Sequence, residues 1–115
     1  QGERKLVVAN SDPDKAYWTV FDLDSADRVV SSGILYDATP QVKGRKGLPD
    51  GLKVDRQGII FATGPGGVYI LNADGVLLGM LHIPEACSNI ALADEGRTLY
   101  ITADRYVLRL KMRKQ

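Results

Sequence analysis

The sequence DGLKVDRQGIIFATG at residues 50–64 recurs in pattern as NIALADEGRTLYITA at residues 89–103, and this repeat indicates the fold. Asp50 matches Asn89, so the two copies begin about forty residues apart. Each copy has an apolar run, a turn that contains glycine and a second apolar run, which is typical of a β-hairpin. A repeat of this length with four strands per unit indicates the blades of a β-propeller.

The rest of the chain reads as short β-rich runs with almost no helix signal. Gly, Pro, Asp and Asn clusters separate the runs roughly every eight to twelve residues, as in an all-β meander. The predicted strands cover residues 5–9, 18–23, 28–36, 51–54, 59–63, 68–71, 77–83, 90–92, 98–102 and 107–111. Labelled A to D from the centre of the ring outward, they read B-C-D, A-B-C-D and A-B-C. We therefore predict an all-β fold, a partial β-propeller of about two and a half four-stranded blades.

This order starts inside one blade and stops inside another. Strand edges are then unpaired and two blade faces uncovered, and Val7, Phe61 and Tyr100 are predicted to lie on those faces. We expect the chain to associate with missing N-terminal blades of the same protein or with copies of itself. The chain starts at Gln1 rather than Met, which is consistent with processing, tagging or truncation.

The composition argues against several other classes of protein. Of 115 residues, 44% are hydrophobic and 25% charged, as in ordinary globular domains. Fifteen Lys and Arg against fourteen Asp and Glu leave a net charge of +1. The basic stretches at residues 43–46 and 111–114 contain no aromatic residue that could stack on a base. We therefore predict no nucleic-acid partner. No apolar run reaches the ~18–20 residues of a membrane span, and no signal peptide is recognisable. The single Cys87 fits a cytoplasmic location, with periplasm and secretion left open.

Several short motifs, in this order and spacing, give the chain a family resemblance. They are RKGLPDGLKVD at residues 45–55, FATG at 61–64, GGV at 66–68, ADGVLLG at 73–79 and LYITAD at 99–104. With this set the chain resembles, over nearly its whole length, the SMP-30/gluconolactonase/LRE-like lactonases, which are six-bladed β-propellers. The resemblance implies that residues 1–115 are the C-terminal part of a single propeller domain, with no second domain.

The resemblance also implies an activity, the metal-dependent hydrolysis of a sugar lactone such as gluconolactone. Of the family's three metal ligands, a Glu, an Asn and the Asp of a Pro-Asp-Gly motif, only the last has a match here, Asp50. Ca²⁺ is the expected ion, with Zn²⁺, Mn²⁺ or Mg²⁺ as alternatives, and only if another segment or chain supplies the missing ligands. The metal would polarise the ring carbonyl and activate water, while Asp50 would be a ligand and a possible proton-transfer group. The isolated chain is expected to be inactive.

Four more polar residues are predicted to bind substrate at the mouth of the channel. Asn89 has the place of Asp50 one blade later, and Asn10, Ser11 and Asp104 lie in loops between second and third strands. For all of these, and for Asp50, the alternative is a structural role in a turn or at a strand start. The alternative function is a non-catalytic, propeller-derived binding or self-assembling module, which the two missing ligands favour.

Other signals are interpreted as structural. The glycine-rich residues 64–67 precede a strand and not a helix, so they are expected to form a tight turn and not a phosphate site. The acidic residues within 22–27 lack the Gly and terminal Glu of an EF-hand loop. His82 and Cys87 have no suitable partner nearby in sequence, and Trp18 is expected to pack between blades.

Overall fold

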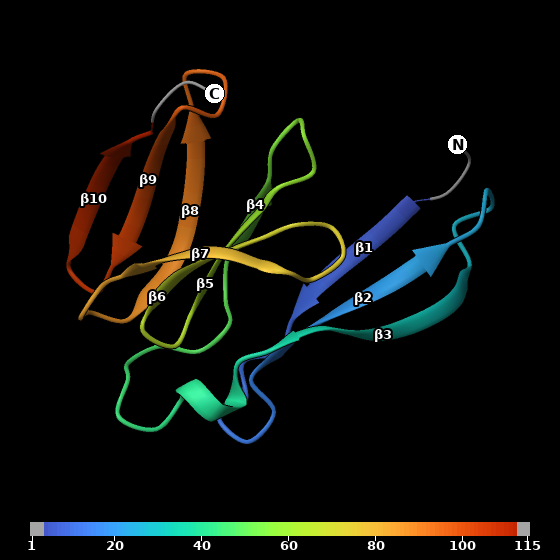
Figure 1. The fold of residues 1–115 in the computed structure, drawn as a ribbon, viewed down its shortest axis with the longest axis horizontal. Helices are drawn as coiled ribbons and strands as arrows, with labels where there is room; N and C mark the ends of the chain where they lie inside the picture. Colours follow the sequence, from blue (N-terminus) through green and yellow to red (C-terminus); the bar gives the residue numbers. More distant parts are fainter. Residues whose placement is uncertain (1–3, 113–115) are drawn as a thin grey trace.

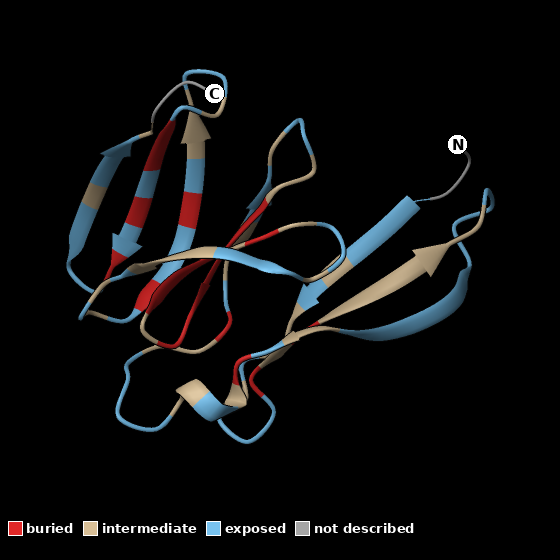
Figure 2. Cartoon of the chain, viewed as in Figure 1, coloured by how far each residue is buried: buried red, intermediate tan, exposed pale blue. Residues whose placement is uncertain are grey.

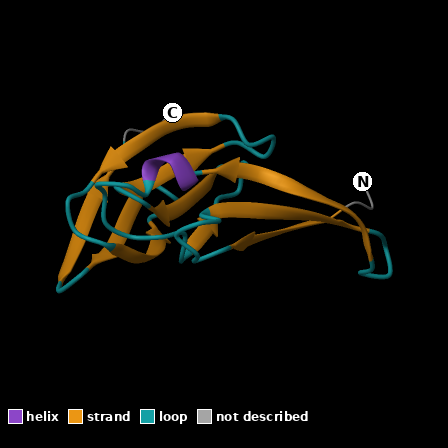
Figure 3. Ribbon diagram, turned by 90° about the horizontal axis from the view of Figure 1, so that it is seen from below, coloured by secondary structure: helices purple, strands orange, loops and turns teal. Residues whose placement is uncertain are grey.

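The computed structural model describes residues 4–112, which form ten β-strands and one short 3₁₀ helix. The strands are β1 (Arg4–Ala9), β2 (Tyr17–Leu23), β3 (Val29–Asp37), β4 (Leu52–Val54), β5 (Ile60–Gly64), β6 (Gly67–Leu71), β7 (Leu77–His82), β8 (Cys87–Ala93), β9 (Thr98–Ala103) and β10 (Tyr106–Lys111) (Figure 1). The helix η1 (Thr39–Gln41) is the one helical turn in this range (Figure 3). Each predicted strand is present with ends shifted by a single residue or none, except β8, which starts earlier than predicted. No helix within residues 4–112 is long and apolar enough to cross a membrane.

The strands form three antiparallel sheets with the orders β1-β2-β3, β4-β5-β6-β7 and β10-β9-β8. The sheets lie side by side as successive sectors, and we call them the first, middle and third blade (Figure 1). Only the middle blade has four strands; the first and third have three each. This is the predicted B-C-D, A-B-C-D, A-B-C order, so the prediction of an all-β partial propeller is confirmed.

Three hairpin turns use the same side-chain device. Asp24, Asp55 and Asn72 each accept, through Oδ1, the backbone N–H groups two and four residues further on, at 2.9–3.0 Å. An Asx side chain of this kind satisfies the donors of a turn that no strand partner reaches. These bonds, chiefly the one from the Arg28 N–H, hold the pKa of Asp24 below its usual value.

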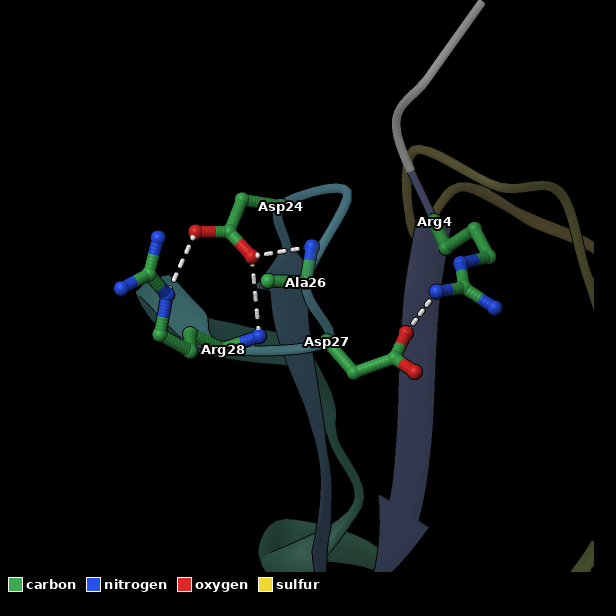
Figure 4. Close-up of polar contacts among 5 residues, drawn as sticks. All are labelled: Arg4, Asp24, Ala26, Asp27 and Arg28. Carbon is green, nitrogen blue, oxygen red and sulfur yellow. Dashed lines mark hydrogen bonds and ion pairs between the residues drawn. The ribbon is translucent and has the colours of Figure 1, made fainter.

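Each of the three acidic residues within 22–27 contacts a different basic residue, so their carboxylates do not form one site. Asp24 contacts the Arg28 Nε at 3.1 Å, and Asp27, in the β2–β3 turn, forms an ion pair with Arg4 at the start of β1 (Figure 4). Asp22 accepts hydrogen bonds from Lys5 Nζ at 2.7 Å and from a serine of β3. These exposed contacts stabilise the β2–β3 end of the first blade, as expected for a structural acidic run.

The apolar cores lie between the blades. The first core joins the first and middle blades and consists of Trp18, Ala38, Ile60, Ala62, Tyr69 and Leu71. The second joins the middle and third blades and consists of Phe61, Val68, Cys87, Ile90, Leu99, Ile101 and Ala103. Because successive side chains of a strand point to opposite faces, β5 supplies alternate residues to the two cores. Buried segments therefore concentrate in the middle of the molecule (Figure 2).

The outer face of the first blade is apolar and exposed. Leu6 and Val8 alternate on the face of β1 that turns away from the middle blade, and the strand pairing places Ile34 of β3 beside Val8 through Thr19. Leu6 is 50% exposed, Val8 42% and Ile34 57%. This face lacks the neighbour that covers the corresponding face of the middle blade.

Two residues predicted to lie on uncovered faces are instead at covered ones. Phe61 is only 4% exposed, because the side of β5 on which it lies packs against the third blade. Val7 packs against the core that contains Trp18, since it points opposite to Leu6. The prediction is therefore wrong for Phe61 and Val7, whereas Tyr100 is 38% exposed on the third blade.

Candidate functional site

The backbone at the start of β4 is fixed to two other strands. The Asp50 N–H donates to the Thr63 carbonyl of β5 at 3.2 Å, and the Gly51 N–H donates to the Ser88 carbonyl of β8 at 2.9 Å. In return, the N–H and hydroxyl of Thr63 donate to the Gly51 carbonyl at 2.9 and 3.1 Å. Pro49, immediately before, is fully buried. The Asp50 backbone is thus held where the middle and third blades meet.

The Asp50 side chain, in contrast to its backbone, has no partner. It is exposed, and its carboxylate makes no hydrogen bond or ion pair with any residue in the described range 4–112. Asp24, Asp55 and Asn72 all close their own turns, which was the structural alternative for Asp50. A hydrogen-bonded backbone that carries an unpaired carboxylate is suited to bind a ligand or to move a proton.

Asn89 lies directly against Gly51. A Cβ on Gly51 would fall 2.2 Å from Asn89 Oδ1 and 2.7 Å from its Cα, so only glycine fits beside Asn89 here. The strand pairing slips between Cys87 and Asn89, which is a β-bulge that re-aims the start of β8. The structure thus brings Asn89 next to the Asp50–Gly51 segment, as its equivalent place in the repeat indicates.

Ser11 and Asn10 share a loop but make different contacts. The Ser11 hydroxyl donates to the Pro49 carbonyl and so links the β1–β2 loop to the residue before Asp50. Asn10 Nδ2 instead donates to the Lys15 carbonyl at 2.8 Å, within its own loop. Ser11 is therefore joined to the Asp50 segment, and Asn10 has the contact expected of a turn residue.

Asp104 lies in the β9–β10 turn with a left-handed φ of 56°. Its N–H donates to the Ala86 carbonyl at 2.8 Å, which joins this turn to the segment that leads into β8. The side chain is exposed. The β1–β2 loop, the segment before β4 and the β9–β10 turn all lie at the lower end of the blades in Figure 1.

Sequence reasoning missed Lys53. Its Nζ donates to Asn89 Oδ1 at 3.3 Å, from β4 of the middle blade to β8 of the third. The available signal was a lysine between Leu52 and Val54 in an innermost strand, where an apolar residue would be usual. Ser88 was missed as well: its hydroxyl lies 2.8 Å from the Thr102 hydroxyl.

Other reactive groups and hollows lie away from Asp50 or are inert. Burial raises the pKa of the Cys87 thiol, with a smaller effect from Glu85, and a protonated, buried thiol is a poor nucleophile. His82 is exposed at the end of β7. A surface hollow of about 480 Å³ lies beside the β8–β9 turn, where Asp94 accepts a hydrogen bond from the buried Thr98. That turn is at the opposite end of the blades from the segment before β4 (Figure 1).

The residues present do not make a metal site by themselves. Within residues 4–112, no three His, Cys, Asp or Glu side chains are grouped as metal ligands would be. Asp50 offers one carboxylate, and a divalent cation in a protein needs several ligands in a defined geometry.

The comparisons with known proteins agree with this fold. The family model for the SMP-30/Gluconolactonase/LRE-like region matches residues 2–105. A gluconolactonase from Zymomonas mobilis is 37% identical over 113 residues, which cover 95% of this chain and 32% of that protein. Among solved structures, a gluconolactonase from Xanthomonas campestris superposes with a TM-score of 0.77 at 25% identity, covering 95% of this chain and 34% of the other. A structural-genomics target named as a candidate gluconolactonase gives a TM-score of 0.69 at 28% identity, with 96% and 37% covered.

The chain spans about a third of the length of these relatives. The match nevertheless runs through all three sheets, from the first strand of the first blade to the β9–β10 turn. With its motifs, its strand order and its relatives in agreement, the chain belongs to the SMP-30/gluconolactonase/LRE-like family.

Proposed function

We propose that a full-length protein carrying this segment hydrolyses a sugar lactone, with aldonolactones such as gluconolactone as the substrate class. Membership of the family and the relatives named gluconolactonase support this reaction. The single observation that carries the role of this chain is the unpaired carboxylate of Asp50 on its hydrogen-bonded backbone. Asn89 beside it, together with Asn10, Ser11 and Asp104 in the neighbouring loops, is proposed to contact the substrate hydroxyls.

Asp50 can act in the reaction as a proton acceptor. Water adds to the ring carbonyl carbon, and the bond between that carbon and the ring oxygen then breaks. The Asp50 carboxylate takes a proton from the attacking water and returns it to the departing ring oxygen, which becomes a hydroxyl group. The products are an open-chain carboxylate and one proton released to solvent. The exposure of Asp50 leaves room for both the water and the lactone.

We propose a divalent metal only as an ion that this chain would bind together with ligands from elsewhere. Asp50 would be the one protein ligand from this chain, and further ligands would have to come from another segment or another chain. Ca²⁺ suits a carboxylate and amide oxygens best, while Zn²⁺, Mn²⁺ and Mg²⁺ are the alternatives.

We also propose how the segment is completed. The exposed apolar outer face of the first blade supports contact with preceding blades of the same propeller domain or with another copy of the chain. The free, buried Cys87 fits a cytoplasmic protein, where thiols stay reduced.

The test is substitution of Asp50 in the full-length protein. Asp50→Asn keeps the shape of the side chain but removes its charge, so kcat/KM for gluconolactone in a pH-stat assay should fall by about 10²–10⁴-fold. Asp74→Asn, at an exposed turn residue in the β6–β7 hairpin, is the matched control and should keep the activity. The 115-residue chain alone should show no turnover above the uncatalysed rate.

Unchanged turnover in Asp50→Asn would contradict the assignment of Asp50. If the parent full-length protein hydrolyses no lactone but still binds sugar acids or lactones, the second candidate, a non-catalytic binding module, takes its place. The observation that favours this second candidate is the absence of a complete ligand group within residues 4–112.

A further inference from the structure

A lysine from the middle blade contacts an asparagine from the third blade that packs against Gly51. Lys53 lies opposite Phe61 in the β4–β5 pairing, so its side chain leaves β4 on the face that turns to the third blade. There Nζ donates to Asn89 Oδ1 at 3.3 Å. Both side chains are exposed. Lys53 thus lies three residues after Asp50 and in contact with the residue that packs against Gly51.

The contacts of Asn89 determine which end of its amide is available. Its Oδ1 accepts the N–H of Ile90 at 2.9 Å as well as the Lys53 ammonium. A backbone N–H and an ammonium are both donors, so the atom that they share must be the amide oxygen. The Nδ2 group remains, with no hydrogen-bond partner in the described range 4–112. Asn89 therefore presents donors to a ligand and keeps its oxygen engaged, which argues against metal coordination by that oxygen.

Lys53 contributes the positive charge of the same site. An ammonium group has three donors and no acceptor, and one of the three is directed at Asn89. Lys53 has no carboxylate partner in the described residues. Together the two side chains offer several unused N–H donors and one positive charge. Donors with a single positive charge are suited to bind an oxygen-rich anion, and charge-assisted hydrogen bonds are the strong ones.

We propose that Lys53 and Asn89 bind the carboxylate of an open-chain polyhydroxy acid, which is what the opening of a sugar lactone produces. This inference rests on the proposed function, because the lactone is neutral and its product is an anion. Lys53 therefore discriminates between the two by charge. Asn89 is held by Lys53 in the orientation that lets it donate.

The experiment measures the binding of gluconate and of glucitol to the full-length protein by isothermal titration calorimetry. Glucitol has the same carbon chain and hydroxyl pattern as gluconate, with a CH₂OH group in place of the carboxylate. Lys53→Met should weaken gluconate binding about tenfold or more and change glucitol binding by less than about twofold. Lys53→Arg should restore most of the gluconate affinity because it keeps the charge. Lys111→Met on β10 removes the same charge far from the site and should change neither affinity.

The outcomes separate this inference from the lactonase proposal. Equal gluconate affinity in the parent protein and Lys53→Met overturns it, even if the protein hydrolyses lactones. An equal loss of both ligands in Lys53→Met, without rescue by Lys53→Arg, also overturns it, because that result indicates a purely structural role. A selective loss of gluconate in a protein without lactonase activity supports the anion site and contradicts only the proposed reaction.

Discussion

The middle blade and the two end blades are built from the same strand pattern, yet their burial differs sharply. Every residue of β5 is buried, and every residue of β6 is buried except Ile70, which is half-buried. In β1 and β3 of the first blade and β10 of the third, most residues are exposed. The edge strands β4 and β7 of the middle blade are also largely exposed, so the difference has two causes: β5 and β6 are central strands, and the middle blade has a neighbour on each side, whereas each end blade has one.

This comparison shows that burial in a blade is a property of its neighbours. An isolated sheet of this kind has two apolar faces and can cover neither alone, so stability comes largely from the interfaces between repeats. Side chains in the middle blade should therefore contribute far more to the free energy of unfolding than equivalent side chains in the end blades.

The largest effect is expected for Tyr69, which is fully buried in β6. Its hydroxyl donates to the Pro65 carbonyl at 2.6 Å, and the centroid of its ring lies 5.3 Å from the centroid of the Trp18 ring. Tyr69→Ala should lower the free energy of unfolding by about 3–5 kcal/mol, measured by urea denaturation. Tyr100→Ala, on the exposed face of the third blade, should cost less than about 1 kcal/mol. Similar losses at both sites would show that the end blades are as well packed as the middle one.

A matched pair of valines gives a smaller but cleaner comparison. Val68 of β6 is 0% exposed, whereas Val8 of β1 is 42% exposed. At protein concentrations low enough to keep the chain monomeric, Val68→Ala should cost about 2 kcal/mol and Val8→Ala less than about 0.5 kcal/mol in the same denaturation assay. A loss above about 1 kcal/mol for Val8→Ala would mean that its face is covered in solution.

The smallest effect on stability is expected at Ile34, on the outer face of the first blade. Ile34→Lys should change the free energy of unfolding by less than about 0.5 kcal/mol but reduce self-association, because it places a charge on the exposed apolar face. Light scattering at micromolar concentration should give a mass above the monomer for the parent chain and a lower mass for the variant. Leu78→Lys, on the outermost strand of the middle blade, is the control and should not change the mass.

A sharp monomer peak with a cooperative melt for the parent chain would contradict this prediction. It would mean that three sheets, with both end faces open to water, are sufficient for a stable unit.

The sequence predicted the strands well because they depend on local signals. Turn residues such as Asn72 and Gly75, together with alternating apolar positions, define where each strand begins and ends. Alternation divides a strand into two faces but does not identify the neighbour of each face, which is why Phe61 was placed on the wrong one. The early start of β8 was missed because the bulge at Ser88 breaks the alternation.

The candidate site was predictable only in part. The repeat located Asp50 and Asn89 at equivalent places, and the structure brings Asn89 against the residue after Asp50. The contact between Lys53 and Asn89 joins two different blades, so it depends on how the sheets are placed and not on either local pattern. Similarly, nothing in the sequence separates Ser11, which reaches Pro49, from Asn10, which closes its own loop.

The aromatic contact between the first two blades has a spectroscopic consequence. Trp18 is the sole tryptophan of the chain, and its fully buried ring packs against those of Tyr36 and Tyr69, which also contact each other. Its indole Nε1 makes no hydrogen bond with the described residues. Because Tyr69 comes from the neighbouring blade and the ring is shielded from water, the tryptophan fluorescence of this chain is expected to report the docking of the first blade onto the middle one.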